Sequence, residues 1–575
     1  MTYMPLQLPP GIVRGANPDD APGRWYDGSL IRWREGIMEP VGGWSRITTS
    51  AMGSTARRIQ QWKRNNSLTM TIVGCDSHLY ADNSGAYVNV APSDLVPLST
   101  VTGGAGYSAG TYGSSTYGTA RTGSTALSPA RAQWSFDNWG EDLLAVASTD
   151  GRLLYYTSGS PSTAAVPVGV YAISSISRTS NVSTIVTATA HNLTTSDLVK
   201  IAGVTDATFN TASVAVTVTN STTFTYANTG TNGSSSAGTV TDLSVPVSNR
   251  AVVVTPERHV ILLQAGGNSR RVAWCSREDY TDWNFASTTN SAGFLDLQSE
   301  TPLVNGCSVR EGTLIWSTNR AFLMRYLGQP FIYGADELGS TKLYSPYAFA
   351  EFDGRCAWME AAGFKLYESG SVRPLPCPLT DYIFSSVDPT YGPRVAHAAL
   401  NGKFNEIWFF YPSMGATECD RYVAWNWSED YWTMGSLSRT AAFPAVVSGY
   451  PVMVGTDKHL YQHEDGWTYS GVDIPTSIYI QSGTLNMPDN ESNLTINQVV
   501  PSNGGNYALT NYSFYSRLTP DGAERSFGPY NSRSDGYVDC RVTGRDVRIK
   551  VSARAGGDWS VGRLRLKVGS VGGRR

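Results

Sequence analysis

Few residues in this 575-residue chain are grouped in a way that could do chemistry. His459 and His463 lie four residues apart and Glu464 follows directly, the residue types of a zinc site. Such a histidine pair needs a helix to bring both imidazoles to one face, whereas the local pattern here predicts a strand and a turn. The whole chain has only six histidines, so general bases are scarce. We interpret the pair as surface turn histidines and predict no metal site.

Carboxylates give no catalytic pattern either. Sialidase-type hairpins carry Ser/Thr-x-Asp-x-Gly-x-Thr-Trp, but the nearest windows, 148–151 and 519–522, place the glycine one position early. The pairs 278–279 and 429–430 lie in predicted turns, where solvated Asp and Glu are expected anyway. No phosphate-binding loop, dinucleotide glycine pattern or Gly-x-Ser-x-Gly elbow occurs in a suitable strand–helix setting. The sequence therefore predicts no enzyme, with no catalytic residues and no cofactor.

An octet repeats near the two ends of the chain. Residues 73–80 (VGCDSHLY) and 454–461 (VGTDKHLY) share six of eight positions. Each is an apolar run, a Gly/Asp turn and an aromatic-ended strand, which is a β-hairpin signal. We therefore assign the shared Asp, His and Tyr to architecture rather than to chemistry. Weaker copies lie between the two, at 146–155, 262–274, 315–323, 357–367 and 408–432.

The spacing of these copies predicts the architecture. Consecutive later copies lie 42 to 53 residues apart, and the two longer early gaps each contain an insertion, 102–130 and 169–245. Without the insertions the period is about 40–50 residues, the size of one four-stranded propeller blade. We expect an all-β chain with a β-propeller of about six to seven blades. The alternative is an array of stacked β-sandwiches with accidental hairpin similarity.

The domain organisation follows from the repeat and its insertions. Residues 1–54 are expected to pack on the propeller or on a neighbouring subunit. The propeller occupies 55–168 and 246–468, and the Ser/Thr/Val-rich insertion 169–245 reads as a small β-barrel. Residues 469–575 read as a separate antiparallel β-sandwich or barrel, in which period two places Val547, Ile549 and Val551 on one face and Arg548 and Lys550 on the other.

Two segments keep two interpretations each. The Gly/Tyr/Ser segment 102–130 is either a disordered linker or a loop that contacts a neighbouring subunit. The C-terminal basic strands are either a solvated face or a docking face for an acidic protein or passing nucleic acid. Only Trp559 interleaves the basic run, which favours protein over nucleic acid.

Composition limits the class of protein. Only 16% of residues are charged, while 57 Gly, 31 Tyr and 16 Trp are typical of a turn-rich all-β chain. Residues 541–575 carry ten Lys or Arg and two Asp or Glu, so the first 540 residues sum to −11 within a net charge of −3. The seven cysteines have no C-x-x-C spacing, which indicates buried thiols in a reducing compartment. We expect no signal peptide and no membrane-spanning segment.

Several short segments are each moderately similar to proteins of one family. They are the Tyr/Gly run 106–118, Pro9–Gly15 (PPGIVRG), Gly23–Arg34 (GRWYDGSLIRWR), Pro40–Trp44 (PVGGW), Val272–Asn284 (VAWCSREDYTDWN) and Leu314–Gly328 (LIWSTNRAFLMRYLG). In these segments the chain resembles the tail nozzle (tail tubular protein B-like) proteins of short-tailed bacteriophages, and the resemblance covers residues 1 to about 470. The insertion 169–245 resembles a small β-barrel that recurs in phage structural proteins.

The resemblance implies a structural virion protein. It implies a hexameric ring below the tail adaptor protein, a conduit and gate for genome ejection, and a platform for tail fibre or spike proteins. Viral DNA would pass through the lumen without specific binding, which suits the acidic balance of the first 540 residues. The expected location is the virion tail, after assembly in the host bacterial cytoplasm.

Two competing hypotheses stay open. One is a receptor- or glycan-binding propeller of a phage tail, with Trp425, Trp427 and Trp432 as sugar platforms. The other is a propeller glycosidase, which would need converging carboxylates that the sequence does not supply.

Overall fold

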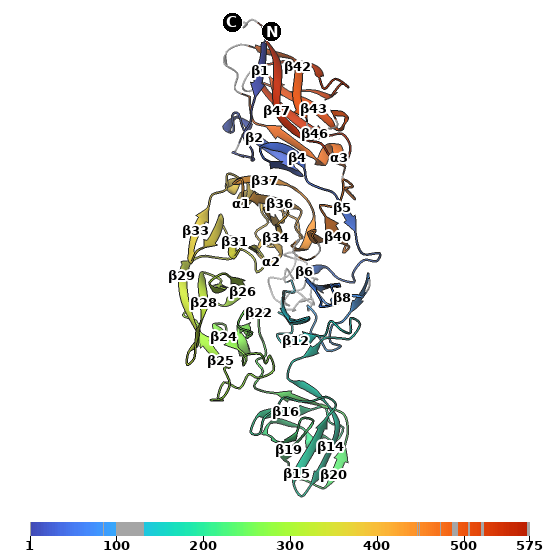
Figure 1. The fold of residues 1–575 in the computed structure, drawn as a ribbon, viewed down its shortest axis with the longest axis vertical. Helices are drawn as coiled ribbons and strands as arrows, with labels where there is room; N and C mark the ends of the chain where they lie inside the picture. Colours follow the sequence, from blue (N-terminus) through green and yellow to red (C-terminus); the bar gives the residue numbers. More distant parts are fainter. Residues whose placement is uncertain are drawn as a thin grey trace, which may run out of the picture. The chain divides into compact units, whose positions relative to one another are not determined.

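The computed structural model describes residues 2–15, 17–83, 85–98, 131–444, 447, 449–471, 473–485, 493–503, 507–518 and 522–571 (Figure 1). The insertion 102–130 lies outside the described residues. The described chain is almost entirely β, as the sequence predicts. Within it, no helix has the length and apolar character needed to cross a membrane. The short helices are α1 (Thr380–Ser386), α2 (Gly392–Val395), α3 (Ile474–Ser477) and 3-10 turns at Pro18–Asp20, Ala207–Phe209, Ala265–Gly267 and Tyr507–Leu509.

The chain divides into two compact units. Unit 1 consists of Met1–Ile59, Tyr344–Glu368 and Val372–Arg575, and unit 2 of Gln60–Leu343 with Ser369–Ser371. Small sheets of four antiparallel strands recur in both units. This construction is consistent with a β-propeller, because each sheet has the strand number of one blade.

Unit 2 holds four such sheets, except that the first strand of the first sheet, β6, begins at Ala56 in unit 1. Within the unit, consecutive sheets bury their faces against each other, and the first strands β10, β22 and β26 are neighbours. The strands are β6 (Ala56–Lys63), β7 (Thr69–Cys75), β8 (Leu79–Asn83), β9 (Ala86–Asn89); β10 (Trp134–Trp139), β11 (Asp142–Ala147), β12 (Leu153–Tyr156), β13 (Val166–Pro167); β22 (Ala251–Val254), β23 (Val260–Leu263), β24 (Arg271–Trp274), β25 (Gly293–Asp296); and β26 (Leu303–Val309), β27 (Gly312–Ser317), β28 (Arg320–Gly328), β29 (Ile332–Ser340).

Unit 1 holds three more four-stranded sheets, which share one core. Their first strands β30, β34 and β38 are again neighbours. The last sheet takes its fourth strand, β5, from the start of the chain. The strands are β30 (Phe349–Phe352), β31 (Arg355–Met359), β32 (Phe364–Glu368), β33 (Ser371–Leu375); β34 (His397–Asn401), β35 (Glu406–Tyr411), β36 (Arg421–Asn426), β37 (Tyr431–Ser436); and β38 (Arg439–Phe443), β39 (Val452–Gly455), β40 (Leu460–His463), β5 (Trp44–Arg46).

The two octets occupy equivalent places in their sheets. Residues 73–80 form the β7–β8 hairpin and residues 454–461 form the β39–β40 hairpin. In the second copy, the carboxylate of Asp457 accepts hydrogen bonds from the backbone N–H of His459 (3.3 Å) and the hydroxyl of Tyr461 (2.6 Å). In the first, a Cβ on Gly74 would lie 2.4 Å from the Trp134 ring. The octet residues therefore shape turns and permit close packing.

Residues 170–242 form an eight-stranded antiparallel sheet with a core of its own, drawn in green and teal in Figure 1. Its first and last strands pair, with Val170 opposite Thr241, so the chain enters and leaves at adjacent points. The strands are β14 (Val170–Thr179), β15 (Val182–Thr187), β16 (Leu198–Ala202), β17 (Thr211–Ala215), β18 (Thr217–Asn220), β19 (Thr223–Ala227), β20 (Gly233–Ser235) and β21 (Thr239–Asp242).

Replacing residues 171–243 with a short Gly/Ser linker is expected to leave the rest of the chain folded. Since the ends are adjacent, the linker closes a small gap and costs little loop entropy. The midpoint of thermal unfolding, followed by tryptophan fluorescence, should shift by no more than about 4 °C, the effect of roughly 1 kcal/mol on a unit of this size. Loss of a cooperative transition would show that the segment is integral to the remainder.

The C-terminal residues form two further sheets with the N-terminal segment. β1 (Thr2–Leu6) pairs with β47, β2 (Trp25–Ser29) pairs with β41, and β3 (Ile31–Arg34) and β4 (Ile37–Pro40) extend the β47 sheet. The C-terminal strands are β41 (Tyr479–Ser482), β42 (Asn493–Asn503), β43 (Thr510–Arg517), β44 (Arg525–Asn531), β45 (Val538–Gly544), β46 (Asp546–Ala553) and β47 (Val561–Val571).

The N-terminal segment contacts the repeat sheet β34–β37 through Leu30, Arg32 and Trp33. Four of its strands also belong to the C-terminal sheets, which the sequence does not predict, and only β5 joins a repeat sheet. The C-terminal strands are also not separate, because they share one hydrophobic core with the three repeat sheets of unit 1. The physical reason is that the edges of β41 and β47 would otherwise lack hydrogen-bond partners. The alternation in β46 is as predicted, with Val547, Ile549 and Val551 buried.

Candidate functional site

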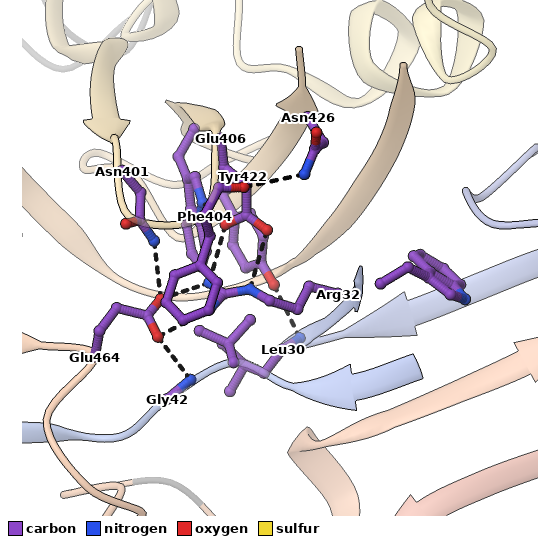
Figure 2. Close-up of polar contacts among 12 residues, drawn as sticks. Leu30, Arg32, Gly42, Asn401, Phe404, Glu406, Tyr422, Asn426 and Glu464 are labelled. Atoms are coloured by element: carbon purple, nitrogen blue, oxygen red, sulfur yellow. Dashed lines mark hydrogen bonds and ion pairs between the residues drawn. The ribbon is translucent and has the colours of Figure 1, made fainter. Parts of the chain in front are cut away.

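Arg32, Glu406 and Glu464 form a buried charge cluster in unit 1 (Figure 2). Arg32 lies on β3 and is only 1% exposed. Glu406 begins β35 and Glu464 follows β40, and both are buried. A buried guanidinium requires paired carboxylates, because an isolated charge there would cost several kcal/mol or more. The three residues thus join the N-terminal segment to two repeat sheets.

Arg32 makes a two-pronged contact with each glutamate. Its Nε and Nη2 donate to the two oxygens of Glu406 at 3.0 and 2.9 Å. Its Nη1 and Nη2 donate to the two oxygens of Glu464 at 2.9 and 2.5 Å. The guanidinium carbon also lies 3.7 Å from the ring centre of Phe404. Bidentate geometry of this kind combines strength with a fixed orientation.

Neutral donors complete the shell around both carboxylates. The indole N–H of Trp408 donates to Glu406 at 2.9 Å. The side-chain amide of Asn401 and the backbone N–H of Gly42 donate to Glu464 at 2.9 and 3.0 Å. Each carboxylate oxygen therefore accepts at least one hydrogen bond. A carboxylate saturated in this way and buried from solvent is a poor general base, because no substrate proton can reach it.

The electrostatics of the charge cluster follow from burial and pairing. Burial raises the pKa of the Glu406 carboxyl, and the neighbouring Glu464 adds to this while Arg32 opposes it. For Arg32 itself, burial disfavours the cation, but the two carboxylates outweigh that effect and raise its pKa. The guanidinium therefore stays charged, and two glutamates share one cation.

Two tyrosines of β36 and β37 and two glycines also hold the N-terminal segment against the repeat sheets. Tyr422 Oη accepts from the backbone N–H of Leu30 at 2.9 Å, and Tyr431 hydrogen-bonds both backbone groups of Trp33. A Cβ on Gly42 would lie 2.5 Å from Glu464 Oε2, and one on Gly43 would lie 2.4 Å from the Thr468 carbonyl oxygen. Only glycine allows the chain this close approach. The charge cluster therefore holds strands together, and its buried, fully hydrogen-bonded carboxylates do not form a reaction centre.

The histidine pair singled out in the sequence is not a metal site in the described residues, which contain no group of three or more His, Cys, Asp or Glu able to hold a metal ion. His459 Nδ1 lies 3.1 Å from the Thr48 hydroxyl. His463 is buried rather than at a surface turn, because β5 covers it: its ring stacks on Trp44 and its Nε2 accepts from Arg439 Nε at 2.9 Å. Burial and the Arg439 charge hold the pKa of His463 well below its usual value.

A buried cysteine–histidine pair also lies in unit 1. Cys419 Sγ is 3.8 Å from His397 Nδ1 and donates to the Val395 carbonyl. Burial raises the pKa of the Cys419 thiol well above its usual value and lowers the pKa of His397 to about 4. Both groups are therefore neutral near pH 7, the opposite of the thiolate–imidazolium pair of a cysteine nucleophile. All seven cysteines are free thiols.

Where the structure describes them, the carboxylates of the acidic pairs and of the sialidase-like windows form ion pairs or hydrogen bonds with other residues of the chain. Asp150 accepts from Arg152 Nε at 2.5 Å. Glu278 pairs with Arg258 at 3.3 Å, and Asp279 accepts from the backbone N–H of Thr281 at 2.9 Å. In the second pair, Glu429 accepts from the backbone N–H of Glu35 at 2.9 Å and Asp430 accepts from the indole N–H of Trp425 at 3.1 Å. Most of the window 519–522 lies outside the described residues.

The three tryptophans considered as sugar platforms do not form an exposed platform. Trp425 and Trp432 are 4% and 3% exposed and stack on each other. Trp432 also packs on Phe364, and half-buried Trp427 packs on Phe352, both from the neighbouring sheet. These tryptophans fill the space between two sheets of unit 1, so a glycan would have to bind elsewhere.

Comparisons with known proteins give distant likenesses only. No protein-family model and no curated protein matches the chain. Among solved structures, BamB from Moraxella catarrhalis is similar over 60% of this chain and 86% of its own, with 8% identity and a TM-score of 0.29. Kluyveromyces lactis Hsv2 is similar over 67% and 98%, with 8% identity and a TM-score of 0.25. Phage phi92 endosialidase is similar over 86% and 78%, with 13% identity and a TM-score of 0.26. At these values the likenesses assign no activity or ligand to this chain.

Proposed function

We propose that this chain is a structural subunit of a bacteriophage tail, of the ring-forming nozzle type. Its seven four-stranded repeat sheets would be the blades of one propeller, which carries the insertion 169–245 as a small barrel. The strand β5 supports ring closure, because it directly precedes the first repeat sheet in the chain yet completes the last one. Six copies would surround the exit path of the viral DNA below an adaptor ring.

The main observation behind this proposal is where the segments that resemble tail nozzle proteins lie in the structure. Arg32 belongs to Gly23–Arg34, and Gly42 and Trp44 belong to Pro40–Trp44, the phrases that resemble tail nozzle proteins. In the structure these three residues form or adjoin the buried charge cluster. A chain whose family-like residues hold strands together is better suited to assembly than to catalysis.

The charge distribution supports passage of DNA without binding. Residues 1–540 have a net charge of −11, so this part of the chain offers no general attraction for phosphates. Affinity for DNA rises steeply with each phosphate that a protein neutralises, and a conduit must avoid that. We place the protein in the virion tail, assembled in the bacterial cytoplasm with adaptor and fibre or spike proteins as partners.

A second candidate is a receptor- or glycan-binding propeller of a phage tail. The observation in its favour is the apolar tip of the β28–β29 hairpin, where Tyr326, Leu327 and Phe331 are 41%, 60% and 74% exposed. Exposed aromatic side chains at a loop tip are common in recognition sites.

Sedimentation velocity and glycan-array binding of the purified full chain separate the two candidates. The nozzle proposal predicts a species at six times the 62.1 kDa chain mass for the chain alone, or a heavier complex that contains six copies when adaptor protein is present, and no glycan binding. A monomer that binds glycans, and loses that binding on Phe331→Ala, would favour the second candidate. Leu68→Ala, at another exposed apolar position (61% exposed), is the matched control.

A further inference from the structure

An apolar groove lies beside β47 in the C-terminal sheets of unit 1. We name it the β47 groove. Its volume is about 530 Å³, large enough for a few side chains of a bound segment. The N-terminal segment and β47 both line it. The apolar residues that the N-terminal segment contributes include Leu6, Leu8, Trp25, Trp33, Ile37 and Met38.

The groove exists because two strands share the same edge of β47 without meeting. β1 pairs with β47 from Leu564 to Val568, and β4 pairs with it only at Val561. Between them, Gly562 and Arg563 have no strand partner on that edge in the described structure. An open backbone stretch flanked by extended strands is suited to a segment that binds in extended form.

The walls are apolar but incompletely covered. Ile37 is 44% exposed, while Trp25 and Trp33 are 5% and 3% exposed and form the deeper surface. A peptide can also pair its backbone with the open edge of β47 at Gly562 and Arg563, which a purely apolar ligand cannot do.

The charge beside the groove selects the kind of peptide. Arg563 lines the groove and Arg565 follows on the same face of β47, and both are exposed. In the described part of the chain neither forms an ion pair, and the one contact of Arg563 is a 3.1 Å hydrogen bond to Gln7. The nearby carboxylate of Glu39 is already paired with Arg34 at 2.8 Å. The groove therefore presents uncompensated positive charge beside an apolar surface.

We propose that the β47 groove is a docking site for an extended peptide of a partner protein, with apolar side chains flanked by Asp or Glu. The apolar side chains would bury against Trp25, Trp33 and Ile37, and the acidic flank would pair with Arg563 and Arg565. This assignment gives the C-terminal basic strands a protein partner. It does not depend on whether the chain forms a nozzle.

Panning a random twelve-residue peptide library on the immobilised full chain tests the proposal. We expect enriched peptides to carry Asp or Glu next to apolar residues, and fluorescence polarisation of a labelled enriched peptide to measure its affinity. Ile37→Asp, and separately Arg563→Glu with Arg565→Glu, should weaken binding by about tenfold or more. Thermal melts check that each variant is folded, and the charge variant keeps the test valid if Ile37→Asp does not fold.

Matched controls are Leu68→Asp, at an exposed apolar position of unit 2, and Arg541→Glu, at an exposed basic position of β45. Both should leave affinity within about twofold of the parent chain. Three outcomes would overturn the proposal: no enrichment, enrichment of basic or uncharged peptides, or an affinity that the folded groove variants leave unchanged.

Discussion

Arg32→Met is expected to lower the free energy of unfolding by about 3–5 kcal/mol, the usual cost of breaking a buried ion pair. The substitution removes the cation that Glu406 and Glu464 share and leaves two buried carboxylates without a counter-charge. Methionine fills similar space, so the loss reports charge rather than volume. Urea unfolding followed by tryptophan fluorescence measures it, because Trp33 and Trp408 lie beside the charge cluster.

The control lies two residues further along the same strand. Arg34 also pairs with a glutamate, Glu39, at 2.8 Å, but its side chain is 66% exposed. Arg34→Met should therefore cost no more than about 1 kcal/mol. Adding Glu406→Gln and Glu464→Gln to Arg32→Met should recover part of the loss, because the unpaired charges are then gone. Equal small losses for Arg32→Met and Arg34→Met would show that the charge cluster does not hold the N-terminal segment.

The second large effect is a loss of stability in mild acid. Burial lowers the pKa of His397 to about 4 from 6.5, so the folded chain keeps this imidazole neutral. Below about pH 6.5 the unfolded chain binds a proton that the folded chain does not, so stability falls as the pH drops toward 4. His397 alone accounts for about 2 kcal/mol at pH 5 and about 3 kcal/mol at pH 4, at 1.36 kcal/mol per pKa unit. His463, whose pKa is also lowered, adds to the loss in the same direction.

Thermal unfolding at pH 7.5, 6.0 and 5.0 checks this expectation. The raised pKa of Glu406 acts in the opposite direction, because protonating that carboxyl stabilises the folded form as the pH falls. The contribution of His397 is therefore measured by comparing the parent chain with a variant that lacks this imidazole. His397→Phe, which keeps a ring next to Phe410, should flatten the decline. A decline as steep as in the parent chain would assign the acid sensitivity to other groups.

Local patterns in the sequence were enough to predict the repeat sheets. The octets lie at equivalent hairpins because an apolar run, a turn and an aromatic-ended strand encode a hairpin within about ten residues. The apolar face of β46 followed from period two in the same way. The insertion has adjacent ends, with Val170 opposite Thr241.

The charge cluster could not be predicted from local patterns. Arg32 meets Glu406 across 374 positions and Glu464 across 432, and no local spacing encodes such contacts. The usable signal was a charged residue within an apolar run, because Arg32 stands between Ile31 and Trp33. The pairing of β1 with β47 was missed for the same reason. The sequence interpretation of His463 was wrong because it did not include β5, which covers that residue.

Electron microscopy of the purified full chain, alone and mixed with a tail adaptor protein, tests the proposed function most directly. We predict closed rings of six copies around a central channel, formed by the chain alone or on the adaptor. Single particles that remain monomeric and never join an adaptor or tail complex would contradict the assignment of this chain to a tail nozzle.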